Sequence, residues 1–505
     1  MSVEAFLERP WGRSHPCYED SFINMRPAPE YSTAEVAVAS LYRSCGFPGY
    51  SENDVPKAGR AFDSASANSR QNETGRISAD GWRTIIHGIL ESPKQPKQSS
   101  RRFIQLCPIV PDIALYSGSA RLSGNSWNPG SLIQRMLQLG TASQSDAEAA
   151  WRKIFAALTV ASSDDIWARW LTEEFCRRRN NDPTWDLASM ESPTGELAAA
   201  DKATLQYPAK QFARDLLAVL EAKSSMTRRQ WMSLIESIVR LGMVTHVLWL
   251  CTIGTRLWKA SSAILGRGEL MPGNAAVDAR AAILAADNKF LSYGNQAMPG
   301  IRDTTSRYLQ SRLGLNLLLW TIAEFGGQPG PLSSAESIDQ FLTLISKRRE
   351  DILRARFWEN FDALQGTETR TILCKSGIGS NIQEFSRHTL GQRQSATETL
   401  RGYDQGYFLR KRSEARNSPF IVSLGPAAVL AVVHCCLRES AGPRSVQRLS
   451  DHLAGYGVEI DLDDIATSDL GKNLRMLGLV LDSPDAESGM LLMPPFTGTE
   501  PSARQ

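Results

Sequence analysis

Between residues 130 and 365 the chain repeats apolar side chains at the spacing of amphipathic helices. The segments SLIQRMLQLG (131–140), DAEAAWRKIFAALTV (146–160) and DDIWARWLTEEFCRRR (164–179) each place apolar residues at i, i+3, i+4 and i+7. Further stretches with this pattern follow up to residue 365, and loops containing proline and glycine separate them. The pattern predicts a mainly α fold built on a multi-helical scaffold.

Two helices of this scaffold are apolar enough to raise the question of a membrane. The segment 231–250 carries Glu236, Arg240 and His246, and charges in the middle of a membrane span are costly. The segment 313–325 is too short to cross a bilayer. Both are expected to be buried core helices, and no membrane partner is predicted.

Cysteine usage and the first residues indicate the compartment. The eight cysteines are scattered, without a C-x-x-C pair, which is typical of small buried side chains in a reducing environment. The opening MSVEAFLERPWGR lacks the apolar segment of a secretory signal. We expect a cytoplasmic protein. Its formal net charge of +2 provides no global field, so any electrostatic recognition needs a local patch.

Residues 419–496 predict three helices followed by a β-hairpin. Pro426 starts an apolar helix, Ser445 caps a second, and Thr467 or Ser468 caps a third. Two apolar strands then flank the turn sequence DSPDAESG (482–489). This order, with the run L-x-x-x-L-x-x-L-G-L-V that begins at Leu470, resembles the winged-helix superfamily. The resemblance implies that the third helix recognises a partner, most often DNA, through outward residues Lys472, Asn473 and Arg475.

Charge complicates DNA binding by this domain alone. Residues 444–496 hold four basic and nine acidic residues, and four minus nine gives a net −5. Phosphate contacts need lysine and arginine. The preceding stretch is basic and aromatic instead: from 387 to 416 it holds seven basic residues against three acids, a net +4. The predicted nucleic-acid-binding residues are Arg387, Arg393, Arg401, Tyr403, Tyr407, Arg410, Lys411, Arg412, Arg416, Lys472, Asn473 and Arg475.

These patterns divide the chain into five segments. A loop-rich N-terminal region of mixed structure covers 1–129, and the helical domain covers 130–365. A basic aromatic connecting region follows at 366–418, then the winged-helix domain at 419–496 and a tail at 497–505.

No catalytic signature competes with these features. KSGIGSN (375–381) lacks the spacing of a phosphate-binding loop and indicates a tight turn. Glu384 and His388 stand at i,i+4 and are the first suspects for acid–base or metal chemistry, although a structural role is favoured. We predict no catalytic residue, no metal ligand and no cofactor.

Three hypotheses about function follow. The first is a non-catalytic subunit that binds DNA and other protein subunits in a multi-protein DNA-processing assembly, of the restriction or phage-defence type. The second is a protein-interaction scaffold that docks through the acidic winged helix. The third is an enzyme with a site around Glu384 and His388.

Overall fold

The computed structural model describes most of the helical core and most of the C-terminal part. The described residues are 2–12, 14–25, 34–47, 128–178, 185–190, 196–204, 207–268, 289–391, 406–413, 417–440, 442–461, 468–482 and 489–496, with short pieces between 81 and 119 and the single residues 415 and 465. The fold is mainly α, as the apolar periodicity predicts.

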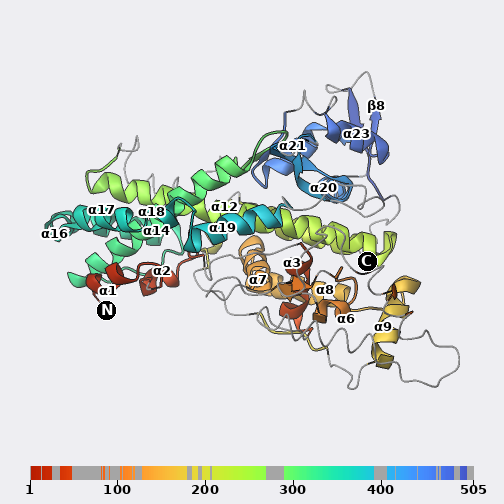
Figure 1. Cartoon of the computed structure of the whole chain (residues 1–505), viewed down its shortest axis with the longest axis horizontal. Coiled ribbons are helices and arrows are strands. Elements are labelled where there is room, and N and C mark those ends of the chain that lie inside the picture. Colours follow the sequence, from red (N-terminus) through yellow and green to blue (C-terminus); the bar gives the residue numbers. More distant parts are fainter. Residues whose placement is uncertain are drawn as a thin grey trace.

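A single long helix, α12 (Arg228–Ile264), runs through the middle of the molecule (Figure 1). Its 37 residues correspond to about 55 Å of helix. Thr227 begins it with a reciprocal capping box, in which Thr227 and Gln230 each bond the other's backbone N–H. The helices that pack along it are α3 (Ala34–Cys45), α11 (Pro208–Glu221), α14 (Met298–Glu324) and α20 (Pro426–Leu437).

Helix α12 is long and apolar enough to span a membrane by length and composition, yet its apolar window is 100% buried inside the protein. Trp231 and Trp249 are among the largest fully buried side chains. The expectation of buried core helices is confirmed for 231–250 and for most of 313–325, which belongs to α14; Phe325 lies just beyond that helix and is 38% exposed.

The remaining helices cover α12 from different sides. In Figure 1, α3, α7 and α8 lie on one side of α12, and α20, α21 and α23 lie on the other. The elements of the N-terminal half are α1 (Val3–Glu8), α2 (Pro16–Glu19), β1 (Phe103–Ile104), α6 (Pro111–Tyr116), β2 (Gly118–Ser119), α7 (Pro129–Gly140), α8 (Gln144–Leu158), α9 (Ile166–Arg178), α10 (Ala199–Thr204) and the 3-10 helix η3 (Ala222–Ser225). After α14 come α15 (Ala335–Lys347), α16 (Arg349–Arg354), α17 (Phe357–Thr367), α18 (Thr369–Ile372) and α19 (Gly377–Thr389).

The C-terminal part alternates helices with short strands. Its order after α20 is β6 (Arg444–Ser445), α21 (Gln447–Ala454), β7 (Val458–Glu459), α23 (Asp469–Met476), β8 (Val480–Asp482) and β9 (Met490–Leu492). Strands β6, β9 and β8 form an antiparallel sheet in that order. Ser468 caps α23, because its Oγ accepts the backbone N–H of Leu470 at 3.2 Å.

Backbone pairing and a buried carboxylate attach this part to the helical core. Strand β3 (Leu291–Ser292), in the connection between α12 and α14, pairs in parallel with β7. Asp215 of α11 is 2% exposed and accepts hydrogen bonds from His452 and Tyr456, each at 2.8 Å. The C-terminal part is therefore held against the core by two separate attachments.

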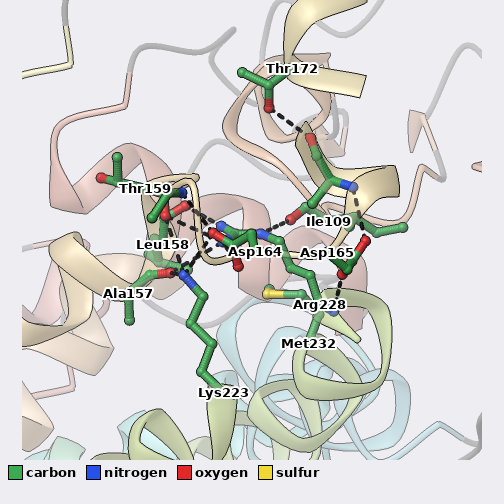
Figure 2. A network of polar contacts seen from close by, with 12 residues as sticks. Ile109, Ala157, Leu158, Thr159, Asp164, Asp165, Thr172, Lys223, Arg228 and Met232 are labelled. Atoms are coloured by element: carbon green, nitrogen blue, oxygen red, sulfur yellow. Dashed lines mark hydrogen bonds and ion pairs between the residues drawn. The ribbon is translucent and has the colours of Figure 1, made fainter. Parts of the chain in front are cut away.

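At its first residue α12 carries a buried cation, Arg228. Figure 2 shows Arg228 and Lys223 converging on Asp164 in the turn between α8 and α9. The Arg228 guanidinium also donates to the carbonyls of Ile109, at 2.7 Å, and of Leu158. Burial alone raises the pKa of the Asp164 carboxyl, but the Ala161 N–H and the two cations outweigh it and lower that pKa. The network joins the start of α12 to the N-terminal half.

Replacing Arg228 with alanine is expected to lower the free energy of unfolding by about 3 kcal/mol, since buried carbonyls and a mostly buried carboxylate lose their donor. Urea unfolding measures this loss. Arg354, whose side chain is 74% exposed, provides the control: Arg354→Ala is expected to change stability by no more than about 0.5 kcal/mol. Equal losses in the two variants would contradict a central role for the Arg228 network.

His246 lies in the middle of α12; both of its ring nitrogens are buried, and they have no hydrogen-bond partner among the described residues. It stacks on Trp249 with ring centroids 5.6 Å apart. Burial, and secondarily the charge of Arg135, lowers the pKa of His246 from 6.5 to about 3. As the pH falls below 6.5, the imidazole of His246 therefore takes up a proton in the unfolded chain but not yet in the folded protein. The free energy of unfolding decreases with falling pH until the pH reaches the pKa of the folded state.

His246→Phe keeps the stacking on Trp249 and removes this titration. Between pH 6 and pH 4, the stability of the natural protein is expected to fall more steeply than that of the variant. The difference in slope approaches about 1.4 kcal/mol per pH unit. Urea unfolding at a series of pH values measures both slopes, and parallel curves would contradict the prediction.

Candidate nucleic-acid interface

The basic stretch ahead of the C-terminal part ends in a β-hairpin. Strand β4 (Tyr407–Lys411) pairs antiparallel with β5 (Phe420–Leu424). The sequences YFLRK and FIVSL are rich in the aromatic and β-branched residues that favour strands. The Arg412 N–H donates to the Pro419 carbonyl at 3.0 Å and closes the connection. Lys411 and Arg412 are exposed near the tip of this hairpin.

A buried arginine of α12 holds the start of the hairpin. Arg240 donates to the carbonyl of Thr389 at 2.7 Å and to the carbonyl of Tyr407 at 2.8 Å, and it pairs with Glu236 at 3.3 Å. Its guanidinium carbon lies 4.9 Å from the ring centroid of Phe408. Tyr407 and Phe408 have φ values of 45° and 76°, a left-handed conformation that costs about 1–3 kcal/mol per residue. The contacts of Arg240 thus hold the chain at the point where its backbone is in this conformation.

Helix α23 lies beside the hairpin. The Arg410 guanidinium of β4 pairs with Asp469, the first residue of α23, at 3.2 Å. Asn473 donates its side-chain N–H to the Leu424 carbonyl of β5 at 3.1 Å. Asn473, predicted to face outward, is half-buried and directs its amide toward β5; its contact with nucleic acid stays a prediction. Lys472 and Arg475 are exposed, with side chains 73% and 42% accessible.

We name this surface the hairpin–helix junction. It is defined by Arg410, Lys411, Arg412, Asp469, Lys472 and Arg475. Carboxylates accompany three of its cations: Lys472 lies 3.7 Å from Asp469, Arg410 pairs with the same residue, and Arg475 lies 3.2 Å from Asp482. Two of the predicted cations, Arg410 and Lys472, thus meet at one carboxylate although they come from segments that are far apart in the sequence.

The other predicted residues do not all reach this junction. Arg387 lies on α19, where it bonds Glu384 at 2.8 Å; α19 packs against α12 and α14 and meets the first half of β4 rather than its tip. Tyr407 is half-buried, and the Arg410 guanidinium lies 5.5 Å from its ring centroid. The predicted residues Arg393, Arg401, Tyr403 and Arg416 lie outside the described residues.

The pair considered for catalysis has an unfavourable position. His388 is 1% exposed, so a substrate in solution does not reach its ring, and Glu384 forms an ion pair with Arg387. In the described part of the chain, no group of three or more His, Cys, Asp or Glu residues is arranged to hold a metal ion. The prediction of a tight turn at 375–381 is wrong for residues 377–381, which form the start of α19; Gly377, the first residue of this helix, has a φ of 56°.

The sequence patterns are sufficient to predict the β4–β5 hairpin, but not the hairpin–helix junction. The two strand-like runs, separated by a polar loop with Asn417, Ser418 and Pro419, are a recognisable hairpin signal that the division at 418/419 overlooks. The approach of Asp469 to Arg410, 59 residues away, has no local signature. Comparison of the chain with protein-family models and with curated proteins finds no match.

Arg240→Met removes the donor for the Thr389 and Tyr407 carbonyls and leaves Glu236 without this cation. We expect a loss of about 3–5 kcal/mol in the free energy of unfolding. In variants that still fold, the amides of β4 and β5 are expected to exchange hydrogen faster, which mass spectrometry measures. Lys259→Met, an exposed change on the same helix, is the control. Unchanged exchange in the hairpin would contradict the anchoring role of Arg240.

Proposed function

We propose that residues 419–496 form a winged-helix domain and that the protein binds nucleic acid through the hairpin–helix junction. The order of α20, β6, α21, α23, β8 and β9 supports the domain assignment. In this arrangement α23 is the recognition helix and the β8–β9 hairpin is the wing. The activity is that of a non-catalytic binding subunit, which acts together with other protein subunits.

The observation that carries the proposal is the gathering of cations from two distant segments. The C-terminal domain has a net −5 and is poorly suited to phosphate by itself. The hairpin places Arg410 beside α23 through the Arg410–Asp469 pair, and the exposed residues Lys411 and Arg412 follow Arg410 along the hairpin. Phosphate contacts from the hairpin position the protein, and α23 is then oriented toward the bases.

A specific observation also favours a protein partner. Met476 at the end of α23 is 68% exposed and Leu481 of β8 is 51% exposed. Exposed apolar side chains close to charged ones are common where proteins dock. In the alternative function these two residues contact another subunit. Apolar docking depends weakly on salt, whereas phosphate binding depends on it strongly.

The double variant Lys411→Gln/Arg412→Gln is expected to weaken binding of a short labelled duplex and to flatten its salt dependence. Each lost phosphate contact reduces the slope of log K against log salt by about 0.9, so two contacts reduce it by about 2. Fluorescence anisotropy between about 50 and 200 mM salt measures the slope.

Lys347→Gln/Arg370→Gln is the matched control, because both residues are exposed and lie on α15 and α18. It changes the net charge equally and is expected to leave the slope unchanged. If the natural protein binds neither duplex nor single strand at low salt, nucleic-acid binding is rejected and protein docking is the remaining function.

A further inference from the structure

Asp469 occupies the centre of the hairpin–helix junction. One carboxylate oxygen, Oδ2, lies 3.2 Å from Arg410 Nη1, and the other, Oδ1, lies 3.7 Å from Lys472 Nζ. One cation comes from the hairpin and the other from α23. Asp482 has a comparable relation to Arg475, at 3.2 Å. The junction therefore presents cations whose charge is partly neutralised by neighbouring carboxylates.

These ion pairs are weak enough to exchange. The side chains of Arg410, Asp469 and Lys472 are 41%, 54% and 73% exposed. Exposed pairs of this kind contribute little to stability, because water and salt screen them and two side chains must be ordered. A phosphate group offers these cations more acceptor oxygens than a carboxylate does. In nucleic acid the phosphates also carry condensed counterions, and their release favours binding of the protein.

We propose that Asp469 is an internal counterion, which nucleic-acid phosphate displaces from Arg410 and Lys472 when the protein binds. This inference rests on the proposed function of the junction. Displacement leaves the Asp469 carboxylate in solvent, still at the first turn of α23, where negative charge is favourable. Asp469 thereby reduces the affinity for any polyanion, and it restricts tight binding to ligands that supply phosphates to both cations together.

The test is Asp469→Asn, with binding of a short labelled duplex and of its single strand measured by anisotropy at several salt concentrations. The asparagine keeps the size of the side chain and removes the competing charge. We expect binding to tighten roughly threefold to tenfold, which corresponds to the loss of two exposed ion pairs. The slope of log K against log salt is expected to become steeper by about 1, because one further phosphate is neutralised.

Two variants separate this mechanism from a change in net charge or in folding. Asp451→Asn removes one exposed acid on α21 that bonds Gln447, so it makes the same charge change away from the junction. It is expected to alter affinity less than twofold. Asp482→Asn, on β8, removes the carboxylate that pairs with Arg475 of α23, and it is expected to tighten binding as Asp469→Asn does. Thermal melting reports whether each variant is folded.

The outcomes distinguish the two proposals. If the natural protein binds but Asp469→Asn and Asp451→Asn change affinity equally, or Asp469→Asn changes nothing while folded, the internal counterion is overturned and the proposed function stands. If Asp469→Asn does not fold, the change in affinity of Asp482→Asn is compared with that of Asp451→Asn instead. Equal changes in these two variants overturn the internal counterion. If neither the natural protein nor the variants bind nucleic acid at low salt, the proposed function itself fails.

Discussion

The arrangement of the protein depends on burying guanidinium groups of α12. Arg228 and Arg240 have side chains that are 0% exposed, and they lie 12 residues apart, about 18 Å along the helix. Taking such a charge out of water is costly unless its donors are satisfied. Arg228 finds acceptors in Asp164 and in carbonyls of the N-terminal half. Arg240 finds them at the end of α19 and the start of β4. Segments that are remote in sequence thus have to meet α12 at defined points.

The same principle joins the C-terminal part to the core. Asp215 is buried on α11 and accepts bonds from Gln211 of its own helix and from His452 and Tyr456 of the C-terminal part, all at 2.8 Å. Tyr293 and Gln296, in the connection that contains β3, bridge to β5. Since β5 also contacts α23, the hairpin, the α12–α14 connection and α23 are fixed relative to one another. The hairpin–helix junction therefore does not rely on a flexible linker to bring its cations together.

Sequence patterns predicted what is local and missed what is long-range. Apolar periodicity located α7, α8, α9, α11, α12 and α14, because each helix shows its buried face in its own residues. The charges of 231–250 served only as an argument against a membrane span, whereas in the structure Arg240 anchors the hairpin. Glu221, Lys223 and Asp215 are close together in the sequence, yet they bond Arg438, Asp164 and His452, which lie far from them along the chain. Partner choice of this kind follows from tertiary packing and leaves no periodic trace in the sequence.

Net charges counted along the sequence do not locate a charged surface when folding brings separate segments together. The net −5 of residues 444–496 and the net +4 of the stretch before them describe two separate surfaces only if the segments stay apart. The Arg410–Asp469 pair shows that they do not, since the most basic strand lies against the first turn of α23. Cations of one segment then form ion pairs with acids of the other. The electrostatic field at this surface depends on which of these ion pairs remain when a ligand approaches. Under the proposed function, an acid close to the cations controls affinity more than an equal charge elsewhere, because only the close one must be displaced.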